Sequence, residues 1–446
     1  MKTKSKIVTI SSLITLMVIC LVLTGVFLFA PIEAHAEYCN VGGCQGSFSE
    51  HGICDDGGHY QPATLNGGVY EISNYGQFLW FAEQVNSGVG VSYNAKLTND
   101  IAFSYRTNIG TGMRPQLVTI YRDFVQVGTS LSASYRGTFD GNGFALTGIK
   151  IDDATLSNVG VFGYLNGGTV KNLEVTGLSL NGNQYVGGLV GYSMNGTIEN
   201  VMTGGTVNGV DSLGGIVGYA DSTTVKNSWS NATLTATTNK GGIVGQVFST
   251  TSNIENCYYL NTKADVGFNG DAANGVAEAK TSAQFSSGEV TYLLGESWGQ
   301  NIDNGSAAQS TPQLFSEART YKALSCEGDG TVVYTNNSSV NENSQTHLWN
   351  TSGFCRTNDS HYQPAKMTTD QHDVDGDGNT DSVYEIANVG NLFWFAGHLA
   401  TGNGDCNAIL MNNLTVNTGT VTEDGSSLRK WVASGSTVDV KVLSIH

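Results

Sequence analysis

The chain has 446 residues and a formal net charge of −17, yet only 13% of its residues are charged and 57 are glycine. A surface that is negative overall repels phosphate groups, so the composition excludes nucleic-acid binding. Many glycines among few charges are atypical of helix-rich folds and favour a turn-rich, all-β protein.

The N-terminus has the pattern of a secretory signal peptide over residues 1–36. A basic start, MKTKSK, precedes an apolar run over residues 7–30, and Ala-His-Ala at 34–36 is a small-residue cleavage signal. The run is also long enough for an uncleaved membrane anchor, which is the alternative. We expect cleavage, no membrane insertion of the mature chain, and a secreted or cell-surface bacterial protein.

Residues 37–106 are predicted to form a cysteine-bearing segment followed by a helical cap. Seven cysteines follow the signal segment, an odd number, so at least one is free or pairs between chains. Export permits disulfides, and Cys44 with Cys54 is the favoured pair here. The alternative is a zinc site formed by Cys39, Cys44, Cys54 and His59, although the spacing is not that of a CxxC knuckle.

The sequence HYQPA occurs at residue 59 and again at residue 361, and each copy continues into an aromatic segment with helical periodicity. The apolar residues at this spacing are Phe78, Phe81, Ala82 and Val85 in the first copy and Leu392, Phe395 and Leu399 in the second. We expect a short helix in each copy that caps the open end of a repeat structure. An uncapped end would expose strand edges and invite aggregation.

A glycine-rich phrase recurs four times between residues 107 and 262. It reads GVFGYLNGGTVKNL, GGLVGYSMNGTIENV, GGIVGYADSTTVKNS and GGIVGQVFSTTSNIENC. The equivalent glycines are Gly163, Gly191, Gly218 and Gly245, and the equivalent asparagines are Asn172, Asn200, Asn227 and Asn256. Both columns keep a period close to 27 residues, which marks a stacked repeat architecture.

Each repeat contains three short segments in which apolar and polar residues alternate, separated by Gly and Asn. This pattern predicts strands and turns. Three strands per repeat, each paired with its equivalent in the next, predict a right-handed parallel β-helix. Two apolar columns would fill its core: Val161, Leu189, Ile216 and Ile243, and Val170, Ile198, Val225 and Ile254. The asparagines would stack at one corner, and the alternating charges of Lys171, Glu199, Lys226 and Glu255 would form an outward column without repulsion.

These phrases resemble the GLUG repeat of secreted and surface-exposed bacterial proteins. YRGTFDGNGFALTGIKI, from residue 135, resembles the segment that leads into such repeats, and NCYYLNT, from residue 256, resembles the segment that follows them. The resemblance covers most of residues 70–303 and implies the β-helical architecture. It also implies a part in large adhesin-like or peptidase-bearing proteins, in which the repeat itself carries no catalytic residue.

Residues 263–321 are predicted to follow the solenoid with one short helix in SAQFSSGEVTYLLGESWG, and residues 322–446 to form a second, partial cap module. Cys326 and Cys355 are the favoured disulfide pair in this part, because Cys54 and Cys355 occupy matching places before HYQPA. Cys257 follows a corner asparagine and is predicted to be a buried thiol.

The second copy contains an acidic insertion, DVDGDGNTD, that the first copy lacks. Its candidate ligands for a structural Ca²⁺ ion are Asp373, Asp375, Asp377, Asn379 and Asp381. Acidic side chains at positions 1, 3, 5 and 9 with Gly378 at position 6 match the first part of a calcium loop. The twelfth position is Tyr384 rather than glutamate, so a solvated acidic loop is the alternative.

The remaining candidate site is a column of tyrosines, Tyr164, Tyr192 and Tyr219, which could bind sugar rings or could be structural. No catalytic motif is found, and the aspartates of the repeats do not share a column, so we expect no enzyme. The predicted function is presentation or adhesin-like binding, with glycans or host or cell-surface proteins as partners. The alternatives are a carbohydrate-active β-helix enzyme, either a polysaccharide lyase or a glycoside hydrolase, and a passive stalk.

Overall fold

The computed structural model describes residues 47–54, 59–109, 116–270, 274–303, 308–326, 331–373, 378–400, 406–416 and 442–444. The predicted signal peptide lies outside these residues. The chain divides into two compact units, residues 1–61 and residues 62–446, and each is described by itself. In the described part, no helix is both long and apolar enough to cross a membrane.

The first unit contains a small antiparallel hairpin. Phe48 forms a bridge with Cys54, and Ile53 forms a bridge with Tyr60. The Cys54 amide donates to the carbonyl of His59 at 3.0 Å. These bonds fix the backbone around Cys54 and His59.

The second unit begins with a hairpin, a helix and a parallel strand. Strands β1 (Thr64–Asn66) and β2 (Val69–Ile72) are antiparallel, and β2 pairs in parallel with β3 (Asn94–Leu97). Helix α2 (Tyr75–Asn86) begins after Asn74, whose side chain accepts a hydrogen bond from the Gln77 amide at 2.9 Å, as an N-cap does.

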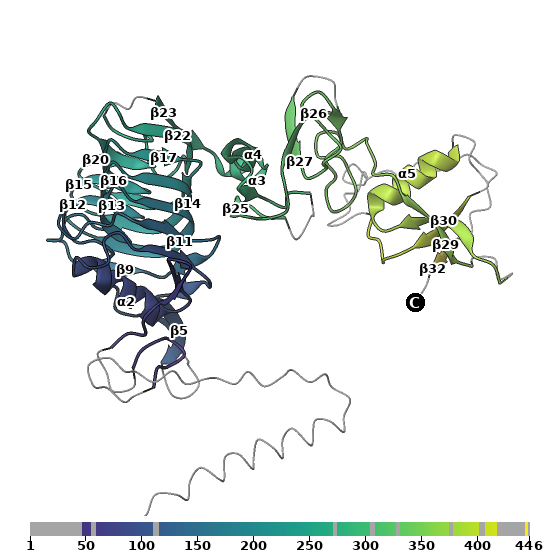
Figure 1. Cartoon of the computed structure of the whole chain (residues 1–446). Helices are drawn as coiled ribbons and strands as arrows, with labels where there is room; N and C mark the ends of the chain where they lie inside the picture. Colours follow the sequence, from purple (N-terminus) through teal and green to yellow (C-terminus); the bar gives the residue numbers. More distant parts are fainter. Residues whose placement is uncertain are drawn as a thin grey trace, which may run out of the picture. The chain divides into compact units, whose positions relative to one another are not determined.

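The buried face of α2 packs on the first repeat. The rings of Phe78 and Phe81 lie 6.3 and 5.9 Å from that of Phe139, and Phe81 also lies 5.7 Å from Tyr135. Figure 1 shows α2 at the purple end of the stacked strands. A helix is therefore present where the sequence predicted one, and it packs on the first repeat.

Six short strands connect the cap to the repeats. They are β4 (Ile101–Ala102), β5 (Ser104–Ile109), β6 (Gln116–Tyr121), β7 (Thr138–Asp140), β8 (Ala145–Thr147) and β9 (Lys150–Asp152). Strands β5 and β6 form an antiparallel hairpin. Strands β7, β8 and β9 all pair in parallel with one long strand of the following repeat, so they make up the first repeat of the stack.

The repeats form three parallel sheets. Figure 1 shows their strands stacked one above another. One contains β10 (Phe162–Asn166), β13 (Val190–Met194), β16 (Val217–Asp221) and β21 (Val244–Val247). Another contains β12 (Gln184–Gly187), β15 (Asp211–Gly214) and β20 (Thr238–Gly241). The largest contains β11 (Thr169–Asn181), β14 (Thr197–Asn208), β17 (Thr224–Lys226), β18 (Trp229–Ser230), β19 (Thr233–Thr235), β22 (Asn253–Leu260) and β23 (Asn274–Lys280).

The register of these sheets follows the sequence period. Val170 lies opposite Ile198, Ile198 opposite Val225, and Val225 opposite Ile254, and all four side chains are fully buried. The column of Val161, Leu189, Ile216 and Ile243 is fully buried as well. We call residues 138–260 the coil stack, one coil being one repeat. Its apolar columns are those predicted, and the all-β class is confirmed.

The column of corner asparagines has left-handed backbone conformation throughout. Their φ angles are 55°, 53°, 50° and 48°, and asparagine adopts this region more readily than other non-glycine residues. Asn200 Nδ2 donates to Asn172 Oδ1 at 3.0 Å, and Asn256 Nδ2 donates to Asn227 Oδ1 at 3.3 Å. Hydrogen bonds between side-chain amides thus join two of the three neighbouring pairs in this column, while Asn200 Oδ1 has no partner among the described residues.

The charged column is also in register. Lys171 lies opposite Glu199, Glu199 opposite Lys226, and Lys226 opposite Glu255. Lys226 pairs with Glu199 at 3.1 Å, while Lys171 pairs with Asp140 of the first coil at 3.4 Å. The side chains are about a third exposed, so each pair contributes at most about 1 kcal/mol.

Two short helices, not the one predicted, follow the coil stack. They are α3 (Ser282–Ser286) and α4 (Glu289–Leu294). Gly288 separates them because its φ of 89° is not helical. An apolar cluster joins them to the stack, and it includes Met202, Trp229, Tyr258, Phe285, Leu294, Trp298 and Leu314. Strands β24 (Trp298–Gly299) and β25 (Gln313–Leu314) complete this segment.

The rest of the chain contains a small sheet, followed by elements in the order of β1, β2, α2 and β3. Strands β26 (Tyr321–Ser325), β27 (Val332–Thr335) and β28 (Gln345–Thr346) form a small sheet. Strands β29 (Lys366–His372) and β30 (Asp381–Ile386) form a hairpin, helix α5 (Val389–Ala400) follows, and β31 (Asn407–Leu410) pairs with β30 in parallel. Strand β32 (Val442–Ser444) pairs with β31. A helix therefore lies at the second predicted place, and the order of hairpin, helix and parallel strand is that of the first copy.

Candidate ligand-binding site

The three predicted tyrosines form one stack of rings. Tyr164 lies opposite Tyr192 and Tyr192 opposite Tyr219, with ring centroids 4.6 and 4.9 Å apart and planes within 20° of parallel. Phe248, which is 69% exposed, continues the stack at 5.9 Å from Tyr219. Because the inner faces cover one another, a sugar ring cannot lie flat on them.

The tyrosine stack is uncharged at neutral pH. Burial raises the pKa of each phenol, and at Tyr192 the neighbouring phenols and Asp221 raise the pKa further. The stack can therefore offer hydrogen bonds but no charge to a ligand.

The acidic loop is only partly described. Asp375 and Asp377 lie outside the described residues. Asp373 accepts a hydrogen bond from the Gly378 amide at 3.0 Å, and Asp381 begins β30. The calcium site, which also involves Asn379, stays a prediction.

The structure does not contain the predicted disulfides among the residues it describes. Cys44 and Cys39 lie outside the described residues, so neither the Cys44–Cys54 pair nor the zinc alternative there is described. The sulphur atoms of Cys326 and Cys355 are 3.5 Å apart, beyond the S–S bond length of about 2.05 Å. The predicted disulfide between them is therefore wrong for this structure, although the two residues do meet.

The environments of two thiols differ sharply. Burial raises the pKa of Cys257 to about 12, in agreement with the predicted buried thiol. Burial also raises the pKa of Cys355, but hydrogen bonds with Thr357 and His347 outweigh this effect and lower the pKa to about 6. Cys355 thus lies in a polar cluster, unlike Cys257.

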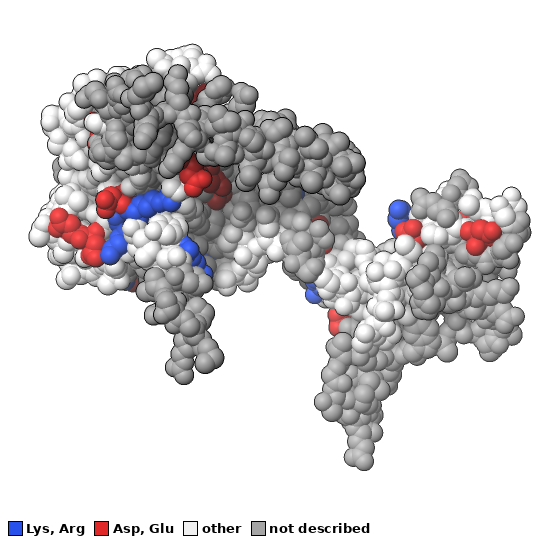
Figure 2. Space-filling view, turned by 90° about the horizontal axis from the view of Figure 1, so that it is seen from below, with Lys and Arg blue, Asp and Glu red and all other residues white. Residues whose placement is uncertain are grey.

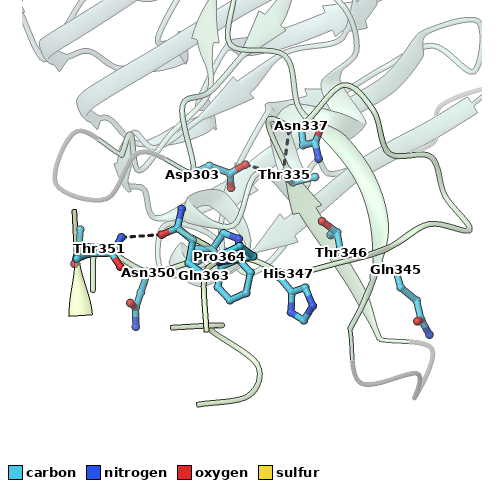
Figure 3. Close-up of a pocket in the computed structure, with 12 residues that line it drawn as sticks. Asp303, Thr335, Asn337, Gln345, Thr346, His347, Asn350, Thr351, Gln363 and Pro364 are labelled. Carbon is cyan, nitrogen blue, oxygen red and sulfur yellow. Dashed lines mark hydrogen bonds between the residues drawn. The ribbon is translucent and has the colours of Figure 1, made fainter. Parts of the chain in front are cut away.

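A cavity of about 690 Å³ opens beside this cluster. Its lining residues are Asp303, Thr335, Asn337, Gln345, Thr346, His347, Trp349, Asn350, Thr351, Gln363, Pro364 and Asn388. Figure 3 shows Asp303 and Thr335 on one side of the cavity, across from Gln363, Pro364 and His347. Sequence reasoning missed this site because its residues come from segments that lie apart in the sequence and share no period.

Hydrogen bonds hold the polar groups of the cavity in place. The Asp303 carboxylate accepts from Thr335 Oγ1 at 2.6 Å and from the Asn336 amide at 2.7 Å. Gln363 Oε1 accepts from Asn388 Nδ2 at 2.8 Å. The cavity therefore presents fixed amides and a carboxylate.

The aromatic part of the cavity is Trp349. Its ring stacks on that of His347, with centroids 4.7 Å apart and planes 14° from parallel. An aromatic ring beside fixed amides and one carboxylate suits a polar ligand that also has a nonpolar face.

The charged side chains on the face drawn in Figure 2 lie in mixed groups, with blue and red side by side and much white surface between them. Lys96 pairs with Glu71 at 3.0 Å and Lys150 with Asp152 at 3.2 Å. Ion pairs of this kind neutralise charge locally. Among the described residues of that face, charges of one sign form no broad patch.

Comparison with known proteins bears on the repeats. Residues 182–208 match the GLUG motif, and they contain β12, β13 and β14, which together make one coil. The chain is 35% identical over 79 residues to halomucin of Haloquadratum walsbyi (strain DSM 16790 / HBSQ001). The aligned part covers 18% of this chain and about 1% of the length of that relative. No solved structure shows a significant match. The resemblance drawn from the repeated phrases is thus confirmed, and the chain is a repeat protein that carries the GLUG motif.

Proposed function

We propose that this chain is a secreted or cell-surface protein that binds a glycan in the cavity around Trp349. The coil stack would be a right-handed parallel β-helix that presents this site in an adhesin-like manner. The observation that carries the proposal is the lining of the cavity, which combines an aromatic ring, several amides and one carboxylate. Sugars have apolar C–H faces that pack on aromatic rings and hydroxyl groups that bond to amides and carboxylates.

Two further observations support a position outside the cell. The N-terminal sequence has the features of a signal peptide, and the GLUG motif resembles that of surface-exposed bacterial proteins. The cavity is also better suited to a sugar than the tyrosine stack, because the inner ring faces of the stack are covered.

The same lining supports a proposal of binding rather than cleavage. Hydrolysis of a glycosidic bond ordinarily uses a pair of carboxyl groups placed about 5–10 Å apart. Asp303 is the single carboxylate among the residues that line the described cavity, and two hydrogen bonds already engage it. We therefore propose a binding protein rather than a carbohydrate-active enzyme.

The full mature chain should bind members of an array of host-type and bacterial surface glycans. Trp349→Ala should weaken binding to any hit at least tenfold in calorimetry, because it removes the aromatic surface of the cavity. Asn337→Ala should weaken binding as well, and Asn337 is exposed, so the fold should tolerate this change. A tenfold loss corresponds to about 1.4 kcal/mol.

Trp394→Ala is the matched control, because Trp394 also stacks on a histidine, His398, at 4.8 Å but does not line the cavity. This variant should bind as the unaltered chain does. Equal binding by the Trp349 and Trp394 variants, or an array without hits, would refute the site. New reducing ends after incubation would instead favour the enzyme.

A further inference from the structure

Two cysteines and two histidines converge beside the cavity. Each of Cys326, His347, Cys355 and His361 offers one ligand atom, and these four atoms all lie within 4.8 Å of one another. The residues are widely separated along the chain, at positions that no zinc-finger spacing predicts. Their convergence is therefore a property of the fold.

Backbone pairing brings the four residues together. Ser325 of β26 lies opposite Thr346 of β28 in a parallel pair, so Cys326 and His347 both follow at the same end of the sheet. Trp349 forms a bridge with Cys355, and the Cys355 amide donates to the His361 carbonyl at 3.1 Å. Three segments are thus held around one point.

The distances suit a tetrahedral metal ion. Zinc bonds of about 2.3 Å to sulphur and about 2.0 Å to nitrogen would place two sulphurs about 3.8 Å apart and sulphur and nitrogen about 3.5 Å apart. In the structure the two sulphurs are 3.5 Å apart, and Cys326 Sγ lies 3.3 Å from His361 Nδ1. The atoms are therefore already close to the corners of such a site.

The arrangement of the rings favours ligation as well. The His347 and His361 rings lie 5.0 Å apart and nearly perpendicular, which lets each nitrogen approach one point from its own direction. Trp349 stacks on His347 and limits its rotation. Supporting contacts of this kind orient metal ligands in known sites.

We propose that Cys326, His347, Cys355 and His361 bind one Zn²⁺ ion. Two thiolates would neutralise the charge of the ion, and soft sulphur with imidazole is the donor set that selects zinc. Four protein ligands leave no open position, which makes the role structural. The ion would fix His347, and through it Trp349, at the wall of the cavity. The metal site does not depend on the proposed glycan binding and can be tested separately.

The first copy shows a related backbone arrangement. Its Cys54 amide donates to the carbonyl of His59, as that of Cys355 does to His361. His59 Nδ1 is buried and has no hydrogen-bond partner among the described residues. We propose no site there. Because this segment could add a second ion to the zinc measured per chain, the zinc content of each variant is compared with that of the unaltered chain.

The test is metal analysis of the full mature chain, kept reduced, after dialysis against excess Zn²⁺ and then buffer. His347→Ala and Cys326→Ser should each contain one zinc fewer per chain than the unaltered protein. Cobalt in place of zinc should give the visible bands of a tetrahedral thiolate complex, and both variants should lose the bands of this site. His347 is exposed, so its replacement removes little buried packing.

His398→Ala is the matched control, because its ring also stacks on a tryptophan, at 4.8 Å and 13°. It should keep the full metal content and the cobalt spectrum. Equal zinc content in the His347 and His398 variants would overturn the proposal. Peptide mapping that finds a Cys326–Cys355 disulfide in the protein as isolated would also overturn it.

Discussion

Replacing Gly214 with alanine should destabilise the coil stack by about 3 kcal/mol, at the upper end of the cost of overpacking. A Cβ atom at Gly214 would overlap the carbonyl oxygen of Val217 and lie 2.6 Å from its carbonyl carbon. Both are backbone atoms, so no side-chain rotation can relieve the clash. Urea unfolding followed by circular dichroism would measure the loss.

The same clash recurs in the neighbouring coils. A Cβ at Gly187 would overlap the carbonyl oxygen of Val190, and one at Gly241 would overlap that of Val244. These three glycines lie opposite one another in the sheet that contains β15. The first glycine of each GG pair is thus required by close backbone approach at the turn between two sheets.

Gly397→Ala is the control, because it replaces a glycine with alanine at a place where the added Cβ meets no atom outside its own helix neighbourhood. Gly397 lies within α5, and no atom outside its own helix neighbourhood lies within 4 Å of a Cβ built there. Alanine should therefore stabilise the helix by about 0.5–1 kcal/mol. A Gly214→Ala variant that unfolds at the same urea concentration as the unaltered chain would contradict the close packing described above.

Replacing Trp298 with alanine should cost about 3–5 kcal/mol and separate the segment of α3 and α4 from the coil stack. Trp298 is 1% exposed and belongs to the apolar cluster that joins the two. Its Nε1 also donates to the carbonyl of Asn227 at 3.0 Å. Limited proteolysis should then cleave after residue 280 sooner than in the unaltered chain.

Replacing each of two buried tryptophans with phenylalanine distinguishes the contribution of packing to stability from that of hydrogen bonding. Trp229 is 2% exposed, like Trp298, but its buried Nε1 has no hydrogen-bond partner among the described residues. Trp298→Phe should therefore cost about 1 kcal/mol more than Trp229→Phe, since only the first leaves a carbonyl without its partner. Equal losses of stability in the two variants would show that the hydrogen bond to Asn227 contributes nothing to stability.

The coil stack could be predicted from the sequence because each coil repeats one set of local requirements. Val170 and Ile198 occupy one column because both must be apolar, and Asn172 and Asn200 occupy another because both adopt positive φ. A period that satisfies such requirements at several columns at once also fixes which residues lie opposite one another.

The cavity and the cysteine–histidine cluster could not be predicted in the same way. The alignment of Cys54 with Cys355 led to the expectation that Cys355 lies near Cys326, and the two residues do meet. His347 has no equivalent in the first copy, so the alignment could not identify it. The cluster depends on the pairing of β26 with β28, across a polar loop without periodicity. The break between α3 and α4 was missed for a similar reason, because the left-handed conformation of Gly288 is not visible in the apolar pattern.

Disulfide trapping between adjacent coils tests the coil stack and its period of about 27 residues most directly. Glu199→Cys with Lys226→Cys places two cysteines opposite each other, with Cα atoms about 4.8 Å apart, within the range that a disulfide spans. Glu199→Cys with Thr224→Cys places them about 8 Å apart on the same strands, outside that range. Mild oxidation and peptide mapping should find rapid cross-linking of the first pair and little of the second. Cross-linking of the second pair at an equal or higher rate would contradict the register on which the coil stack rests.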